Sequence, residues 1–237
     1  MTNTIEYGEL IYSDLQAISR TDMLTATFNS NGWMKLAAKI QQTPITVTEF
    51  RQACASYPIV FTQKNPAIPI ALMSLNLGKN PFVKKNQWQK GHYAPMSLRR
   101  YPFLLDTKDD QNILAIDQAI FEETGYSSRL FNDNGENSAT LDSAIELCQN
   151  YDLQMKNTVL LCQQIEEMGL FTEKQLTIKD KEGNEKTTGL FRMIDSAKYQ
   201  QLEPAAILAL HKTQALWLIH THMISLDRVR NIASMSA

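Results

Sequence analysis

The clearest pattern along the chain is a helical spacing of apolar residues between positions 140 and 168. Apolar residues recur there every three or four positions, and Gly169 follows where a helix commonly ends. The pattern predicts a helix of about 28 residues with one apolar stripe. A second helix is expected to begin at Pro204, which suits a first helical turn, and to continue to about Asn231. The positions that recur in the first helix are Leu141, Ile145, Cys148, Asp152, Met155, Val159, Cys162, Ile165 and Met168.

The first half of the chain contains short apolar segments separated by Pro, Gly, Asn and Asp, which is typical of strands joined by turns. Thr46 followed by Glu49 forms a capping box, so a short helix is expected over residues 47–56. Asp195 is expected to cap another short helix that ends near Leu202. Two strands are expected at 59–61 and 70–75. The strands 82–83 and 88–93 are expected to flank a turn at 84–86. Two hairpins are also expected, one formed by 101–105 and 113–116 around a turn at 106–111, and one formed by 176–178 and 190–194 around a turn at 180–184.

Strands concentrated before helices indicate an α+β fold. We expect a mainly antiparallel β-meander with two long helices of the C-terminal half packed on one face. The 237 residues allow one large or two small domains, and neither an internal repeat nor an obvious linker interrupts them. We therefore predict a single domain over residues 1–237. Residues 1–45 would form an N-terminal extension or the first strands, residues 46–136 would be mostly β, and residues 138–237 mostly α with one hairpin.

The composition narrows the class of protein. Hydrophobic residues make up 43% and charged residues 20% of the chain, which fits a globular protein with a core. The net charge of −2 gives no basic excess, so no nucleic-acid partner is expected. No run of about 18 apolar residues occurs, so no membrane span is predicted. The first residues lack the pattern of a signal peptide, and the three cysteines form no close pair, so we expect reduced thiols and a cytoplasmic location.

Three histidines near the C-terminus were considered as metal ligands. His220 and His222 are two residues apart, which separates them by about 200° on a helix. No Asp or Glu stands three or four residues from either of them or from His211. We therefore expect no metal site and no cofactor, and predict buried or half-buried imidazoles that are hydrogen-bonded to the strands. A ligand-binding or catalytic role of His211 or His220 is the alternative.

The segment Gly91–Phe103 is the main candidate for ligand binding. It gathers an imidazole, two phenols and two guanidinium groups between probable strands. Guanidinium groups can hold a carboxylate or phosphate with two hydrogen bonds, and aromatic rings can stack on a planar ligand. In the alternative, Tyr101 and Phe103 belong to the core and one arginine forms a structural salt bridge. The candidate ligand-binding residues are His92, Tyr93, Arg99, Arg100, Tyr101 and His211.

No complete catalytic motif appears in the sequence. There is no Gly-x-Ser-x-Gly elbow, and no cysteine has a histidine beside it in sequence. The glycine patterns of dinucleotide and nucleoside-triphosphate sites are also missing. The segment 132–136 has the composition of a calcium loop but lacks its final glutamate, so we expect a turn there. Catalytic residues cannot be assigned from these patterns.

The order of several segments resembles the bacterial SapC family, whose name comes from a gene linked to surface-layer proteins. The block Leu98–Arg99–Arg100–Tyr101–Pro102–Phe103 is the most specific part of the resemblance, which extends over about residues 45–226. The other matching segments are Tyr57–Pro58–Ile59–Val60–Phe61, Pro69–Ile70–Ala71–Leu72, Gly91-x-Tyr93-x-Pro95, Met168–Gly169–Leu170, Gly189–Leu190, and Leu208-x-Leu210–His211 with His220 and Leu226.

The resemblance implies an accessory protein. Members are often encoded beside flavin-dependent tryptophan-halogenase-like proteins and outer-membrane receptors, and the family supplies no established catalytic residues. Our hypothesis is a non-enzymatic accessory or interaction protein that binds a partner protein or small ligand through Gly91–Phe103. One alternative is an enzyme or modifier of a small aromatic or peptide substrate that uses His92, Arg99, Arg100 and His211. The other alternative is a structural component of the surface layer.

Overall fold

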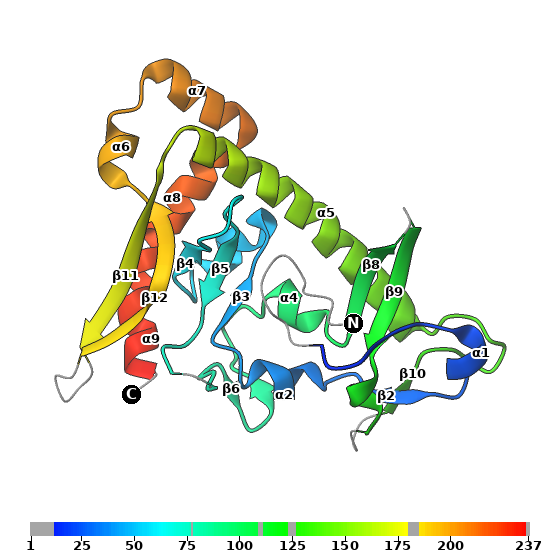
Figure 1. The fold of residues 1–237 in the computed structure, drawn as a ribbon. Coiled ribbons are helices and arrows are strands. Elements are labelled where there is room, and N and C mark those ends of the chain that lie inside the picture. Colours follow the sequence, from blue (N-terminus) through cyan, green and yellow to red (C-terminus); the bar gives the residue numbers. More distant parts are fainter. Residues whose placement is uncertain (1–11, 77, 109–110, 123–126, 180–184, 236–237) are drawn as a thin grey trace.

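The computed structural model of the protein describes residues 12–76, 78–108, 111–122, 127–179 and 185–235 (Figure 1). Antiparallel sheets and helices make up these residues, so the expected α+β class is confirmed. The expected turn at 180–184 and part of the turn at 106–111 lie outside the described residues.

The larger sheet has five antiparallel strands in the order β11-β12-β4-β5-β3. Two of these strands, β4 and β5, correspond to the expected apolar segments at 59–61 and 70–75, and all their residues are buried. Burial on both faces explains why these strands are continuous apolar runs without alternating polar positions. The strands are β3 (Gln42–Pro44), β4 (Ile59–Phe61), β5 (Pro69–Leu72), β11 (Phe171–Lys179) and β12 (Glu185–Ile194).

A second sheet, in the order β1-β9-β8, contains the hairpin that was expected around residues 106–111. The middle strands therefore do not form one continuous meander, because β4 and β5 pair in the larger sheet while β8 and β9 pair with β1. Two short ladders, β2–β10 and β6–β7, complete the described strands. The bounds are β1 (Leu15–Ala17), β2 (Thr27–Asn29), β6 (Val83–Lys84), β7 (Gln87–Trp88), β8 (Phe103–Lys108), β9 (Gln111–Asp117) and β10 (Ser127–Arg129).

The long helix predicted from the apolar stripe is α5 (Ala139–Glu167), which crosses the molecule diagonally in Figure 1. The Ser138 side chain caps its start by accepting a hydrogen bond from Leu141 N at 3.2 Å. Gly169 follows its end with φ of +64°, a conformation that favours glycine. The short helices are α1 (Arg20–Met23), α2 (Trp33–Ala37), η1 (Val47–Glu49), α3 (Phe50–Ala53), α4 (Met96–Arg99), η2 (Gln118–Glu122) and α6 (Ser196–Gln200).

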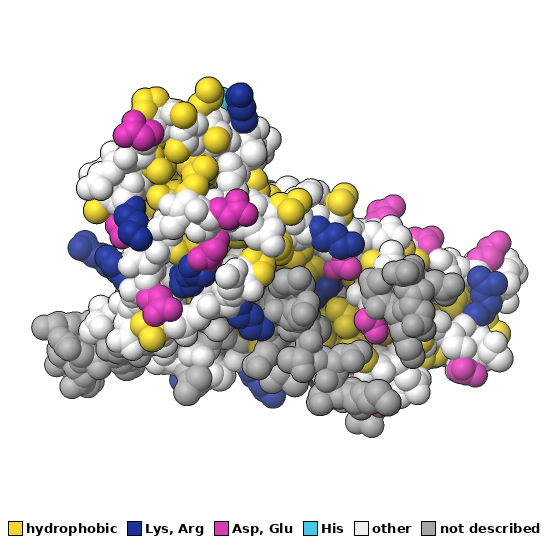
Figure 2. All heavy atoms as spheres, turned by 45° about the horizontal axis from the view of Figure 1, so that its top comes forward, with side chains coloured by type: hydrophobic (Ala, Val, Ile, Leu, Met, Phe, Trp, Pro, Cys, Tyr) yellow, Lys and Arg dark blue, Asp and Glu magenta, His cyan; other side chains and the backbone are white. Residues whose placement is uncertain are grey.

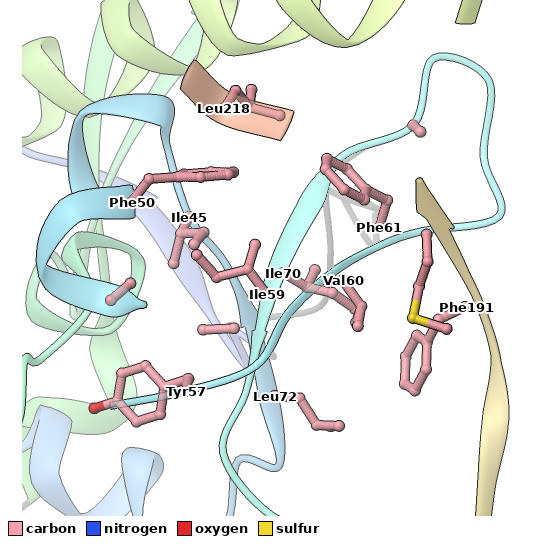
Figure 3. Close-up of a cluster of buried hydrophobic side chains, with 14 of the residues drawn as sticks. Ile45, Phe50, Tyr57, Ile59, Val60, Phe61, Ile70, Leu72, Phe191 and Leu218 are labelled. Atoms are coloured by element: carbon pink, nitrogen blue, oxygen red, sulfur yellow. The ribbon is translucent and has the colours of Figure 1, made fainter. Parts of the chain in front are cut away.

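The helix α5 contributes to three clusters of buried side chains. Its first half packs with the β8–β9 hairpin, and its last half packs with the five-stranded sheet. Between them, Tyr151 and Met155 pack against Ile68 and Met96. Figure 3 shows part of the largest cluster, in which side chains from β4, β5, α3 and the C-terminal helices meet.

The helix that was expected to run from Pro204 to Asn231 is divided into several pieces. Gln214 adopts a left-handed conformation with φ of 71° and ends the first piece. Its backbone N–H donates to His211 O at 3.2 Å, which closes the last turn before the chain changes direction. The pieces are α7 (Pro204–Thr213), α8 (Ala215–Ser225), η3 (Leu226–Arg228) and α9 (Val229–Met235). In Figure 1, α7 projects away from the sheets while α8 and α9 lie along β11 and β12.

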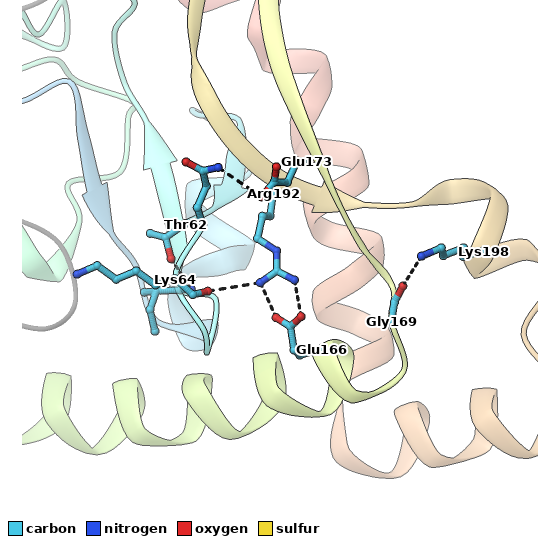
Figure 4. A network of polar contacts seen from close by, with 9 residues as sticks. Thr62, Lys64, Glu166, Gly169, Glu173, Arg192 and Lys198 are labelled. Atoms are coloured by element: carbon cyan, nitrogen blue, oxygen red, sulfur yellow. Dashed lines mark hydrogen bonds and ion pairs between the residues drawn. The ribbon is translucent and has the colours of Figure 1, made fainter.

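A polar network joins the end of α5 to β12 (Figure 4). Arg192 on β12 forms a two-pronged ion pair with Glu166 and donates to Lys64 O at 3.4 Å. Lys198 donates to Gly169 O at 3.0 Å, close to the helix end. These contacts fix the point from which the chain turns into β11, and they hold the base of the projecting α6–α7 segment.

Candidate functional site

One buried carboxylate holds the segment Gly91–Phe103 against the rest of the protein. Glu49 completes the predicted capping box by accepting from Thr46 N at 2.8 Å. The same carboxylate accepts from Met96 N at 2.7 Å and from the Tyr93 hydroxyl at 3.1 Å. Burial raises the pKa of Glu49, although these donors act in the opposite direction. The hydroxyl of Tyr93, a predicted ligand-binding residue, is therefore engaged inside the protein.

Arg100 lies in the interior. Its side chain is 5% exposed, and its guanidinium lies 4.1 Å from the centre of the Tyr151 ring and 3.6 Å from Asp152. Both partners belong to α5, and no described group accepts a hydrogen bond from the Arg100 Nε. This arrangement fits the alternative in which one arginine of the pair forms a structural ion pair.

Arg99 is exposed on the surface. Its Nε donates to Ala94 O at 2.9 Å, and its guanidinium lies 5.8 Å from the centre of the Tyr93 ring. A further hydrogen bond of 3.4 Å joins the guanidinium to the Tyr93 hydroxyl. The side chain is thus folded back onto its own loop, and a ligand would contact it only from the solvent side.

The other residues predicted in this segment also make internal contacts. His92 is half-buried, with Nδ1 at 3.3 Å from Ser56 Oγ and its ring packed edge-on against Phe82. Tyr101 is buried, and its hydroxyl donates to Asp117 at 3.3 Å. Tyr101 therefore belongs to the core, as the alternative for this segment predicted. A ligand-binding role of these residues stays a prediction.

His211 lies elsewhere, in a surface pocket of about 650 Å³ between η1 and the α7–α8 corner. The corner exists because Gln214 is left-handed, which turns α8 back toward the sheet while α7 points outward. No residue of Gly91–Phe103 lines this pocket. The six predicted residues are therefore not brought together in it. The pocket is lined by Val47, Thr48, His211, Gln214, Leu216, Trp217 and His220.

The two other C-terminal histidines have different surroundings. His222 is fully buried, and its imidazole accepts from Ile194 N at 3.2 Å and lies 2.7 Å from Ile59 O. Burial lowers the pKa of His222 to about 4, so the ring is neutral at pH 7. The expected buried imidazole bonded to strands is confirmed for His222. For His211 and His220 it is wrong, because both are exposed, and His220 is hydrogen-bonded to the Tyr199 hydroxyl.

The three cysteines are free thiols in different surroundings. Cys148 and Cys162 are buried on α5, and burial raises the pKa of each thiol to about 12. Cys54 is partly exposed, and all three thiols are free. Within the described ranges, no three side chains of His, Cys, Asp or Glu converge as a metal site would require. None of the described helices combines the length and hydrophobicity needed to cross a bilayer.

The comparison with protein families decides which family this sequence represents. The SapC family model matches residues 25–232, which is most of the chain. The chain belongs to the SapC family. Comparisons with curated proteins and with solved structures give no match. The SapC match includes both the Gly91–Phe103 segment and the α7–α8 corner.

Sequence reasoning missed several residues that shape this SapC protein's surface. Trp217 was not among the candidate residues, yet it is 41% exposed and lines the pocket. Gln214 gave no signal, because neither glycine nor proline marks the corner. Apolar residues occur on most sides of the helix expected over residues 205–219. A helix at the surface seldom buries all of its faces, so this pattern could have predicted exposed apolar side chains here.

Proposed function

We propose that this SapC-family protein is a non-enzymatic accessory protein that binds a partner protein at the surface formed by α7, α8 and the pocket between them and η1. The observation that carries the proposal is the exposure of apolar side chains on α7 and α8. Leu210 is buried on α7, whereas Ile207 and Leu208 are 40% and 53% exposed. Figure 2 shows hydrophobic side chains gathered on the projecting part of the molecule that contains α7.

Exposed apolar clusters of this kind often mark contact surfaces in soluble proteins. Trp217 extends the cluster into the pocket, and its ring centre lies 6.2 Å from that of the buried Phe50. Tryptophan is among the residues that contribute most to binding energy at protein interfaces. The surface therefore supplies both an apolar platform and a pocket that can receive a partner's side chain.

The contacts of Gly91–Phe103 favour an interface on the helices over one on this segment. Arg100 and Tyr101 hold the strands and α5 together, and Tyr93 is bonded to the buried Glu49. The alternative of an enzyme needs this loop and His211 in one pocket. The pocket lined by His211 contains no loop residue, so the binding function is the better supported proposal.

The location of the protein is part of the proposal. We propose a cytoplasmic accessory protein, whereas the alternative of a surface-layer component requires export. Cell fractionation with an antibody against the protein separates the two. Recovery in the envelope fraction with none in the cytosol would favour the surface-layer alternative.

The family resemblance suggests the partner to test first, a flavin-dependent tryptophan-halogenase-like protein, because members of the family are often encoded beside one. The two purified proteins are mixed and analysed by size-exclusion chromatography with light scattering. We expect a complex whose dissociation constant rises at least tenfold in an Ile207→Ser, Leu208→Ser, Trp217→Ala triple variant.

A matched control is Leu153→Ser, because Leu153 is 57% exposed on α5, outside the proposed surface. This variant should bind like the original protein. Equal binding by the folded triple variant would remove the α7–α8 surface from the proposal. Failure of the two proteins to associate at all would reject this partner.

A further inference from the structure

The stretch of chain that forms the α7–α8 side of the pocket contains no acidic residue. From Pro204 to Ser225 the chain contains no Asp and no Glu, but it contains Lys212 together with three histidines. His211, Lys212 and His220 are exposed. The nearest acidic residue before this stretch, Glu203, stands at the opposite end of α7, about 12 Å from His211 along the helix axis.

A further basic residue is exposed near the opposite wall of the pocket in the sequence. Val47 and Thr48 line it, and Arg51 is exposed one turn further along the same segment. The acidic residue of this wall is Glu49, which is buried and turned inward toward Thr46, Met96 and Tyr93. Its carboxylate is therefore not presented to a ligand. Where α5 reaches the corner, Thr213 contacts the neutral Gln164, and the exposed Glu167 follows about one turn later on α5.

The floor of the pocket is apolar. Leu216, Trp217 and Val47 line it, and Phe50 supports the Trp217 ring from beneath. A volume of about 650 Å³ falls in the range of pockets that hold ligands or anchoring side chains. A group that fits would therefore offer an apolar body to Trp217, and the exposed Lys212 and Arg51, which neighbour lining residues in the sequence, would favour negative charge beside it.

We infer that the pocket receives an acidic amphipathic segment of the partner protein, which inserts an aromatic or aliphatic side chain against Trp217 and pairs its carboxylates with Lys212 and Arg51. The inference rests on the proposed function and specifies the chemistry of the partner. The imidazole of His211 supplies a further hydrogen-bonding group at the pocket. A basic segment would meet like charges at the same positions.

Two synthetic peptides test this inference. The first has an amphipathic sequence of Leu, Phe and Glu, and the second replaces every Glu with Lys. Calorimetric titration should give at least tenfold tighter binding for the Glu peptide at low salt, with the difference shrinking as salt screens the charges. Neither peptide contains tryptophan, so all tryptophan fluorescence comes from the protein. A blue shift of this fluorescence on binding, absent in Trp217→Phe, would show that the peptide binds beside Trp217.

Variants separate the apolar and the charged parts of the site. Trp217→Ala should weaken binding of the Glu peptide at least tenfold. Lys212→Glu combined with Arg51→Glu should reverse the preference toward the Lys peptide. Lys39→Glu is the charge control, because Lys39 is exposed just after α2, and α2 lies away from α7 in Figure 1. This variant should keep the original preference.

Some outcomes overturn the inference. These are equal affinity for the two peptides, preference for the Lys peptide, no binding of either at millimolar concentration, or binding that Trp217→Ala leaves unchanged. The complex with the halogenase-like protein is measured separately. If that complex still depends on the α7–α8 surface, the proposed function stands and only the acidic character of the segment is rejected.

Discussion

At the scale of single residues, the adjacent Arg99 and Arg100 have opposite surroundings because one step along a helix turns the side chain by about 100°. Arg100 packs on Tyr151 and pairs with Asp152, whereas Arg99 bonds only within its own loop. Arg100→Ala should lower the free energy of unfolding by about 2–4 kcal/mol, because it removes the packing on Tyr151 and the ion pair with Asp152. Urea denaturation measures the change.

Arg99→Ala is the control for this prediction. Its side chain is exposed, so the change in unfolding free energy should stay within about 0.5 kcal/mol. Similar losses in the two variants would mean that the interior contacts of Arg100 contribute little. The sequence showed two guanidinium groups in a loop, but it could not show which one faces α5, because that depends on how the loop docks.

Glu49 is the second residue whose role can be tested. Its carboxylate accepts four hydrogen bonds, from Thr46 N, Thr46 Oγ1, Met96 N and the Tyr93 hydroxyl. In Glu49→Gln, the amide nitrogen of the new side chain would face donors, so we expect a loss of about 1–3 kcal/mol in unfolding free energy.

The matched control for Glu49 is Gln52→Ala, a change at an exposed position of α3 in the same segment. Its unfolding midpoint in urea should remain near that of the original protein. If Glu49→Gln were no less stable than this control, the carboxylate would not be what holds Gly91–Phe103 in place.

At the scale of secondary structure, the elements that follow from local pattern were predicted well. The 3.6-residue period and Gly169 located α5 to within a residue or two, and the hairpins at β8–β9 and β11–β12 were expected. Sheet membership was not predictable, because pairing of β12 with β4 joins residues far apart in the sequence. The corner at Gln214 was missed for a similar reason, since packing and not local sequence determines it.

Gln214 supplies a prediction at this scale. A left-handed conformation costs a residue with a side chain about 1–2 kcal/mol, and glycine escapes this cost. Gln214→Gly should therefore raise the free energy of unfolding by about 0.5–1 kcal/mol, while Gln214→Val should lower it. Thermal unfolding followed by circular dichroism compares the two variants, and a lower midpoint for the glycine variant would contradict the assigned conformation.

At the scale of the whole molecule, α5 and the C-terminal helices hold the sheets together from different sides. The first and second halves of α5 pack into different clusters of buried side chains. On α8, His222 joins two neighbouring strands of the larger sheet through the backbone of Ile59 and Ile194. Ser225 lies one turn later on α8, and its hydroxyl oxygen accepts a hydrogen bond from Ile59 N at 2.8 Å. The attachment of α8 thus depends on a neutral imidazole between backbone groups.

This neutral imidazole makes the stability of the molecule depend on pH. Burial lowers the pKa of His222 to about 4 from its usual value of 6.5, so between these values the unfolded chain binds the proton and the folded protein does not. The free energy of unfolding therefore decreases as the pH falls from 6.5 to 4, by up to about 3 kcal/mol.

Urea unfolding at pH 7 and pH 5 should show this loss in the original protein and in the control variant His211→Gln, because His211 is exposed. In His222→Gln the protein should be less stable at pH 7, yet the dependence on pH should be smaller. If the free energy of unfolding changed equally with pH in His211→Gln and His222→Gln, groups other than His222 would control the acid sensitivity.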